Sequence, residues 1–411
     1  MIAIFGAGLY GLTFAHFLRN KDFLIVEKDH FVGGLCKSLG AGYRIVMDRG
    51  GHVFHSLADT EVSWLNSLGV NLVKKDRVAR IYLSGKYYDA PKAIDYPFQT
   101  FYGQAGEKVA AECGKGLAKE GAATDMSNLS AWLKSRFGPG IMKHFFSPYN
   151  KKYWKFPTNR IDVVGSNRVP SSQSRGYNSS FYYPNMGGCG MAVNAITQTL
   201  NSKNFLTSAV PKDIDADKKT FTANKITYKW DKIVSSVPIY DLVNSIRNAP
   251  AAVRRCAKAL KYTSMYVLTF IWKSGKKDFV NTHWVYLPDP SFPFCRAYFM
   301  KAFSENTSPE GYEQVSLELP VFMDKKIEWL EDLEHFEDTE IDGIRVTMPT
   351  IDYLSPAYCI FDKGWQKRVE TIQEYLKSKD IYSVGRYGSW QYWDMGETIR
   401  GARALAQEFN K

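Results

Sequence analysis

The feature that most constrains this chain lies at its N-terminus, where a glycine-rich turn joins an apolar run to a helical pattern. The turn reads Gly6-Ala7-Gly8-Leu9-Tyr10-Gly11 and follows the apolar residues 1–5. In such a turn the first glycine permits a tight bend and the second lets backbone N–H groups approach a pyrophosphate. The third lets the following helix pack on the sheet. The sequence therefore predicts a dinucleotide site that begins at Gly6.

Two later features agree with this prediction. A second apolar run, 23–26, is followed by Glu27, 21 positions after Gly6. A carboxylate about 20 positions after the turn accepts a hydrogen bond from a ribose hydroxyl. A further glycine pair comes shortly afterwards. We expect the cofactor-binding residues of this segment to be Gly6, Gly8, Gly11, Glu27, Gly33 and Gly34.

Length and composition predict a multi-lobed protein in a reducing compartment. A chain of 411 residues is long enough for two or three lobes, and 45% hydrophobic residues support a large core. No apolar stretch is long enough to cross a membrane, and the first residues belong to a strand rather than to a signal peptide. The 6 cysteines are scattered without zinc-binding spacing, so we expect no metal site, reduced thiols and a cytoplasmic location.

The net charge of +11 favours an anionic partner. Nucleic acid, an anionic membrane face and a phosphorylated small molecule all fit such a charge. The basic residues do not cluster in an arm of the kind that binds nucleic acid. We therefore expect a small-molecule partner, no nucleic acid and no insertion into a membrane, and the oligomeric state stays open, with a homo-oligomer among the alternatives.

The pattern of apolar segments predicts an α/β fold with a discontinuous Rossmann-like nucleotide-binding domain. Apolar runs at 1–5, 23–26, 232–235 and 381–384 can assemble one open sheet from distant parts of the chain. Segments 262–272, 284–287, 295–303 and 313–321 are rich in aromatic and β-branched residues, which favours an antiparallel substrate sheet. The expected parts are the first nucleotide-binding part (1–55), a mainly helical lobe (56–165), a β-sheet wall with a return to the nucleotide domain (166–245), the substrate sheet with surface helices (246–375), and the final nucleotide-binding part (376–411).

A second glycine pair, Gly50-Gly51, precedes His52. Adjacent glycines let the backbone lie close against a flat ligand, and a histidine there can form a hydrogen bond to a redox ring. Taken alone, a glycine turn with a surface histidine is the simpler interpretation.

The wider context changes that interpretation, because the chain resembles the flavin-dependent UDP-galactopyranose mutases from Met1 to about Gln407. Some of the shared motifs are similar to the bacterial enzymes, such as the ending Tyr392-Trp393-Asp394-Met395, and others to the eukaryotic ones. The motifs that carry the resemblance are Gly50-Gly51-His52, Tyr96-Pro97-Phe98-Gln99, Tyr149-Asn150-Lys151-Lys152-Tyr153-Trp154, Arg168, the segment 176–181, Trp284-Val285-Tyr286 with Arg296, and the segment 385–395.

The resemblance implies an isomerase of cell-wall or glycan biosynthesis that interconverts UDP-galactopyranose and UDP-galactofuranose. It implies FAD that is active when reduced, with NADPH or NADH as the reductant, and a covalent adduct between the sugar and reduced FAD. The implied catalytic residues are His52, which tunes the flavin, and Arg168 and Arg296, which hold the diphosphate. The further implied cofactor residues are Gly50, Gly51, Val210, Arg386, Asp394 and Met395, and the implied substrate residues are Tyr96, Phe98, Gln99, Tyr149, Asn150, Trp154, Asn178, Trp284, Tyr286, Tyr358 and Tyr392.

These residue types suit the chemistry. A uracil base needs an aromatic surface, and a base–aromatic stack contributes about 1–3 kcal/mol. The planar fork of an arginine matches phosphate oxygens. For Asp394 two roles are open: orienting Arg386, or capping the final helix.

Three alternatives remain at this stage. An oxidase or desaturase of the amine oxidase and protoporphyrinogen oxidase group shares the flavin domain, but it favours an apolar or amine-binding pocket over one rich in arginine and tyrosine. A mutase for another UDP-sugar, such as an N-acetylated one, keeps the same motifs. A non-catalytic protein that binds a nucleotide or nucleic acid has only the basic charge in its favour.

Overall fold

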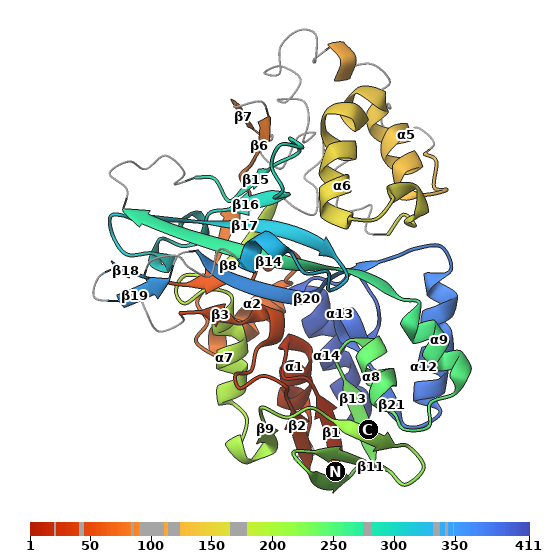
Figure 1. Ribbon diagram of the computed structural model, residues 1–411. Helices are drawn as coiled ribbons and strands as arrows, with labels where there is room; N and C mark the ends of the chain where they lie inside the picture. Colours follow the sequence, from red (N-terminus) through yellow and green to blue (C-terminus); the bar gives the residue numbers. More distant parts are fainter. Residues whose placement is uncertain are drawn as a thin grey trace.

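The computed structural model describes most of the chain, and it is shown in Figure 1. No described helix is long and apolar enough to cross a membrane. The described residues are 1–19, 22–40, 45–83, 86–89, 111–113, 124–164, 179–273, 281–331, 338–341, 344–347 and 349–411.

A five-stranded parallel sheet forms the nucleotide-binding part. Three of its strands come from distant parts of the chain, which confirms the predicted discontinuous Rossmann-like domain. The central strands β1 and β2 are apolar at every position, as is typical of parallel strands covered on both faces. The strand order is β21 (Ile381–Ser383), β13 (Lys232–Ser235), β1 (Ile2–Phe5), β2 (Phe23–Val26) and β9 (Phe205–Leu206).

Helices cover both faces of this sheet, and β1 shows how. Ile2 and Ile4 belong to one core cluster, whereas Ala3 and Phe5 belong to the other. The final helix packs on the first, and the Tyr10 hydroxyl donates to the Gly401 carbonyl at 3.1 Å. The first face carries α1 (Leu9–Phe17), α7 (Gly190–Gln198) and α14 (Met395–Phe409), and the second carries α8 (Ile239–Ser245), α9 (Ala251–Lys258) and α12 (Trp365–Lys377).

A seven-stranded sheet lies across the carboxyl ends of the parallel strands (Figure 1). Its long strands pair antiparallel, as predicted, but residues 350–360 and 79–89 add strands that the sequence analysis missed. Among the described residues of this sheet, one pair of strands is parallel and joins β15 to β6. The strand order is β20 (Thr350–Ile360), β14 (Lys261–Lys273), β17 (Tyr312–Phe322), β16 (Arg296–Tyr298), β15 (Trp284–Tyr286), β6 (Ala79–Leu83) and β7 (Lys86–Asp89).

Within the described residues of the segment 56–165, strands accompany the predicted helices. After α2 (Asp59–Ser67) the chain forms β5 (Leu72–Asp76), which pairs with β8 (Ser180–Pro184), before β6 and β7 join the large sheet. The pairs β5–β8 and β6–β15 join residues more than 90 positions apart, so local sequence patterns do not reveal them, whereas β7 pairs with β6, its neighbour in the chain. The helical portion consists of α5 (Leu129–Ile141), a π-helical turn (Met142–Phe146) and α6 (Ser147–Trp154).

Smaller elements complete the described structure. They are η1 (Gly34–Cys36), η3 (Thr158–Arg160), η5 (Ser202–Asn204), η6 (Glu305–Thr307), β3 (Ser38–Leu39), β4 (Met47–Asp48), β10 (Lys212–Asp215), β11 (Thr220–Ala223), β12 (Ile226–Lys229), α10 (Met300–Phe303), α11 (Glu328–Glu331), β18 (Asp338–Ile341), β19 (Ile344–Thr347) and α13 (Gly385–Gly388).

Candidate active site

The turn after β1 has the predicted geometry of a dinucleotide-binding turn. Gly6 has a φ of +94°, and its N–H donates to the Val26 carbonyl at 2.9 Å. A Cβ atom on Gly11 would lie 2.1 Å from the Gly6 carbonyl oxygen, so only glycine lets α1 approach this closely. A Cβ atom on Gly8 would meet nothing within 4 Å. The face of Gly8 at the start of α1 is therefore open to a ligand, where backbone N–H groups can bind an anion.

The glycine pair at 33–34 packs directly on this turn. The Gly33 N–H donates to the Ala7 carbonyl at 2.8 Å, and a Cβ atom on Gly34 would lie 3.2 Å from Gly8 Cα. Both glycines have positive φ. The two glycine segments therefore line one side of the same candidate site.

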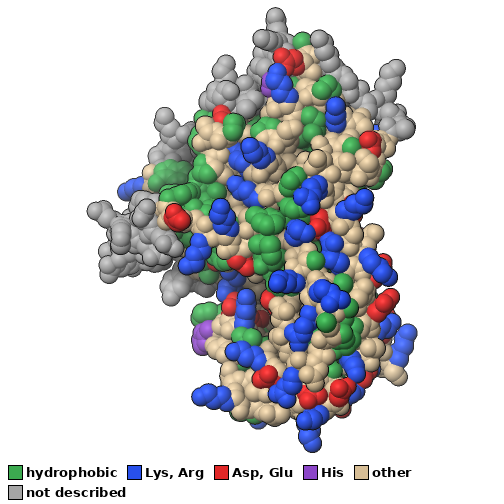
Figure 2. Space-filling view, turned by 45° about the vertical axis from the view of Figure 1, so that its right-hand side comes forward, with side chains coloured by type: hydrophobic (Ala, Val, Ile, Leu, Met, Phe, Trp, Pro, Cys, Tyr) green, Lys and Arg blue, Asp and Glu red, His purple; other side chains and the backbone are tan. Residues whose placement is uncertain are grey.

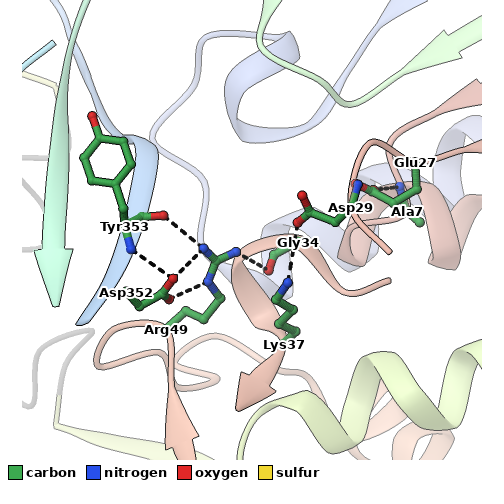
Figure 3. Close-up of polar contacts among 8 residues, drawn as sticks. All are labelled: Ala7, Glu27, Asp29, Gly34, Lys37, Arg49, Asp352 and Tyr353. Carbon is green, nitrogen blue, oxygen red and sulfur yellow. Dashed lines mark hydrogen bonds and ion pairs between the residues drawn. The ribbon is translucent and has the colours of Figure 1, made fainter. Parts of the chain in front are cut away.

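Glu27 lies beside the turn (Figure 3). Its carboxylate is buried and accepts the N–H groups of Ala7 at 2.7 Å and Asp29 at 2.9 Å. A carboxylate has about four acceptor sites, so Glu27 can accept a further hydroxyl. The Ala209 N–H donates to the Glu27 carbonyl at 2.9 Å, which places the exposed Val210 next to this acid.

The glycine pair at 50–51 is packed on both sides. The Gly50 N–H donates to the Asp48 carbonyl at 2.8 Å and contacts the Tyr298 hydroxyl at 3.1 Å. A Cβ atom on Gly51 would lie 2.5 Å from Trp284 Nε1. A side chain at position 51 would therefore push this segment away from β15.

His52 presents a neutral imidazole to the site. One ring nitrogen bonds to the Leu35 backbone, whereas Nδ1 is buried and has no partner within the described ranges. Burial, together with the positive charges of Arg386, Arg296 and Arg49, lowers the pKa of His52 to about 3. At neutral pH the ring can form hydrogen bonds, but it is a poor base for abstracting a proton from a substrate.

This lowered pKa makes a prediction about stability. In the unfolded chain the histidine has a pKa near 6.5, so between pH 6.5 and 3 the unfolded chain binds this proton more readily than the folded protein does. The free energy of unfolding therefore decreases as the pH is lowered through this range. When the pH is lowered from 7.5 to 5, we expect the Tm of His52→Gln, measured by circular dichroism, to decrease less than the Tm of the wild type. The exposed His30→Gln is the control and should follow the wild type. Equal losses in His52→Gln and the wild type would contradict the prediction.

Arg296 lies opposite Glu318 across the β16–β17 pair. Its Nε and one Nη donate to the two carboxylate oxygens, each at 2.8 Å, and the same Nη lies 3.5 Å from the Tyr358 hydroxyl. The side chains are 17% and 2% exposed, respectively. This bidentate pair holds the arginine in one orientation at the wall of the site.

Arg386 of α13 has no carboxylate partner in the part of the chain that the structure describes. Its guanidinium lies 5.0 Å from the Tyr392 ring and 5.1 Å from the Tyr358 ring, and one Nη donates to the Trp393 carbonyl at 3.1 Å. Its Nε is buried without a hydrogen-bond partner among the described residues. An enclosed cation without a counter-charge favours a bound anion.

Asp394 caps the final helix, which was the alternative to orienting Arg386. Its carboxylate accepts the Glu397 N–H and the Ser56 hydroxyl, both at 2.8 Å. The Glu397 carboxylate in turn accepts the Asp394 N–H at 2.7 Å and so completes a capping box. Met395 is the first residue of α14 and is buried.

The aromatic residues of α6 face the large sheet. Tyr149, Asn150 and Trp154 are all buried. The Tyr149 ring lies 5.5 Å from the Tyr286 ring, and the Trp154 ring lies 6.4 Å from the Tyr358 ring. The two predicted uracil-binding aromatics thus face different tyrosines of the large sheet, as their separation around the helix predicts, and both rings also pack on Tyr153.

A cavity with about 420 Å³ of empty volume joins several of these groups. It brings together the predicted residues at 50–52 with Arg296, Tyr358 and Arg386. The full lining is Leu35, Arg49, Gly50, Gly51, His52, Met265, Val267, Arg296, Glu318, Leu354, Ala357, Tyr358 and Arg386.

Arg49 and its partner are functional candidates that the sequence analysis missed (Figure 3). Arg49 bonds both carboxylate oxygens of Asp352, at 2.6 and 2.8 Å, and the Gly34 carbonyl at 3.4 Å. It thereby ties the glycine loop of the nucleotide-binding part to β20. Only its position directly before the glycine pair distinguishes it in the sequence.

Arg77 and Tyr153 were also missed. Arg77 lies 5.1 Å from the Trp284 ring and donates to the Tyr286 hydroxyl at 2.6 Å. The hydroxyls of Tyr153 and Tyr392 are 3.2 Å apart. The chain has 53 lysines and arginines, and nothing in the local sequence sets Arg77 apart from the rest.

Some predicted residues lie outside the described residues: Tyr96, Phe98, Gln99, Arg168 and Asn178. Within the described ranges, no group of three or more His, Cys, Asp or Glu side chains is arranged to bind a metal ion.

The fold and the site define a protein of the dinucleotide-binding class. Residues 4–65 match the family described as an NAD(P)-binding Rossmann-like domain. This match covers the turn after β1, Glu27 and the glycine pairs at 33–34 and 50–51.

Solved structures share the whole architecture. A reduced UDP-galactopyranose mutase superposes with a TM-score of 0.85 at 23% identity, covering 99% of this chain and 94% of that chain. Cyclohexylamine oxidase from Brevibacterium oxydans IH-35A gives a TM-score of 0.64 at 12% identity, and the superposition covers 100% of this chain and 98% of that chain. A fatty acid isomerase from P. acnes that produces CLA gives a TM-score of 0.63 at 15% identity, and the superposition covers 99% of this chain and 98% of that chain. These likenesses establish the fold, which several activities share.

Proposed function

We propose that this chain is an FAD-dependent mutase that interconverts UDP-galactopyranose and UDP-galactofuranose. The observation that carries the proposal is the cavity beside the dinucleotide turn, where Arg296 and Arg386 lie among tyrosines next to a neutral His52. Cations with hydroxyl donors suit a diphosphate far better than they suit an amine or an apolar substrate.

The described residues fit FAD. The open face of Gly8 and the N–H groups of the first turn of α1 suit its pyrophosphate, and Glu27 can accept from its ribose. The buried His52 Nδ1 and Arg386 Nε lack protein partners within the described ranges, and a flavin ring carries oxygen and nitrogen atoms that can pair with them. When bound and reduced, FAD supplies the nucleophile for the anomeric carbon of the sugar. NADPH or NADH is the proposed reductant.

The chain's own residues bind and orient the substrate. Arg296, fixed by Glu318, stabilises the negative charge of the departing diphosphate, and we assign the same role to Arg168. The hydroxyls of Tyr358 and Tyr392 add hydrogen bonds to this anion. Tyr149 offers a ring for the uracil base. No carboxylate has to act as an acid or base toward the sugar.

The test is an assay of the purified protein loaded with FAD. The flavin is reduced with dithionite, UDP-galactopyranose is added, and formation of the furanose is followed by chromatography. We expect conversion with reduced protein and none with oxidised protein. Absence of conversion despite bound FAD and bound UDP would contradict UDP-galactose as the substrate and would favour another UDP-sugar.

An oxidase is the second candidate, because cyclohexylamine oxidase shares the fold. If the protein is an oxidase, it should consume oxygen with amine substrates and should not bind UDP. Calorimetric titration with UDP on the same FAD-loaded sample separates the two classes. Micromolar binding of UDP supports the mutase, whereas amine-dependent oxygen uptake without UDP binding supports the oxidase.

Two glycine variants test the cofactor site. Gly8→Ala places a Cβ atom in open space and should leave the Tm of the cofactor-free protein unchanged, while weakening FAD binding at least about tenfold by blocking the pyrophosphate. Gly11→Ala drives its Cβ atom into the Gly6 carbonyl and should lower both FAD binding and Tm. FAD fluorescence titration and thermal unfolding measure both effects. If Gly8→Ala binds FAD as tightly as the wild type, the pyrophosphate does not lie against this face.

A further inference from the structure

Seven exposed cations form one surface, which we call the basic face. None of the seven has a carboxylate partner in the part of the chain that the structure describes. They lie in or next to four elements: Lys151 in α6 and Lys155 directly after it, Arg160 in η3, Arg255 and Lys258 in α9, and Lys363 just before α12 with Lys367 in its first turn.

Backbone contacts show that these elements adjoin one another. Ile161, directly after η3, bridges to Asp362, directly before Lys363, and the Asp162 N–H donates to the Phe361 carbonyl at 2.7 Å. Helices α9 and α12 pack together. Helix α6 also contacts η3, so the elements that carry the seven cations adjoin one another. Figure 2 shows the side that α9 and α12 occupy, with Lys and Arg side chains spread over its middle and acidic side chains gathered toward its lower end.

The acid directly before Lys363 does not offset the seven cations. Asp362 is buried and pairs with Lys261 at 2.6 Å and also with Arg368. Its charge is therefore already balanced by two further cations. The seven exposed charges present a surplus to the solvent and are part of the net charge of +11 of the chain.

We propose that the basic face docks the protein on an anionic lipid bilayer. Five of the seven cations are lysines, which are mobile point charges on flexible stems rather than planar forks suited to one fixed anion. Lipid head groups diffuse and gather under such dispersed charges, so no shaped groove is required. The attraction acts over about a Debye length, roughly 10 Å at 0.1 M salt.

A nucleic acid fits this face less well, because single strands bind where aromatic rings can stack on successive bases. The exposed aromatic residues Phe31, Trp272 and Trp329 belong to other elements. One ring, Phe292, is 38% exposed in a loop whose carbonyls accept from Lys152 of α6. A single ring suits insertion between head groups better than it suits stacking on a row of bases.

The experiment is co-sedimentation of the FAD-loaded full chain with sucrose-loaded vesicles. Vesicles of phosphatidylglycerol and phosphatidylcholine in equal parts are compared with phosphatidylcholine alone, at 50 and 500 mM NaCl. We expect binding only to the anionic vesicles and loss of binding at high salt. The variant Lys155→Gln, Lys258→Gln, Lys363→Gln, Lys367→Gln should bind at least about tenfold more weakly.

A matched control removes four exposed lysines that do not belong to the basic face: Lys203→Gln, Lys212→Gln, Lys225→Gln, Lys229→Gln. It carries the same net charge as the first variant and should keep most of the wild-type binding. Thermal unfolding and bound FAD confirm that both variants fold. Absence of vesicle binding at low salt, or an equal loss in both variants, would overturn the proposal. Displacement from vesicles by an equimolar single-stranded oligonucleotide would assign the face to nucleic acid instead.

Discussion

Arg296→Ala is expected to weaken UDP binding roughly 10- to 100-fold, because a charge-assisted hydrogen bond contributes about 1.5–3 kcal/mol. The same substitution leaves the Glu318 carboxylate, which is 2% exposed, without its partner. Breaking such a buried pair costs about 3–5 kcal/mol of unfolding free energy. Calorimetric titration with UDP and urea denaturation measure the two effects, and bound FAD should be retained.

A double variant separates binding from stability. Arg296→Met combined with Glu318→Gln leaves no lone charge in the wall, so most of the stability should return, whereas UDP affinity stays low. Glu318→Gln alone keeps the cation and serves as the control for UDP binding. If the double variant binds UDP as tightly as the wild type, Arg296 does not hold the diphosphate.

Arg386→Met is expected to make the midpoint potential of bound flavin more negative by roughly 30–60 mV. A positive charge beside the ring favours the reduced, anionic form, and 30 mV corresponds to about 1.4 kcal/mol for a two-electron couple. Because Arg386 has no carboxylate partner within the described ranges, the Tm of the cofactor-free variant should be unchanged or higher. UDP affinity should change much less than the potential.

Spectroelectrochemical titration of the FAD-loaded protein measures this shift. Arg368→Met is the matched control, since that arginine pairs with Asp362 outside the cavity lining and should leave the potential unchanged. A shift of the same size in both variants would reflect net charge alone. If the potential of Arg386→Met is unchanged, Arg386 does not lie beside the flavin ring.

The nucleotide-binding sheet could be predicted from short segments. The apolar runs at β1 and β2 match the observed strands closely, because a strand covered on both faces is apolar at nearly every position. The predicted segment 232–235 coincides with β13, whose two central residues are apolar. Strand β20 was missed, and Pro356 lies within it. Proline cannot donate to a ladder and is tolerated at a sheet edge, which is where β20 lies.

The sequence by itself determined the dinucleotide turn at residues 6–11, because its glycines act through local backbone geometry: a positive φ at Gly6 and a close approach at Gly11. It also determined that Asp394 was a candidate helix cap, since a cap and its helix are adjacent in the chain. The tertiary structure alone decided the partners of the arginines at and near the site. Arg49 meets Asp352 across 303 positions, and Arg77 meets Tyr286 across 209. Such pairs form only when distant strands come together, and no local pattern records which arginine will face which carboxylate or hydroxyl.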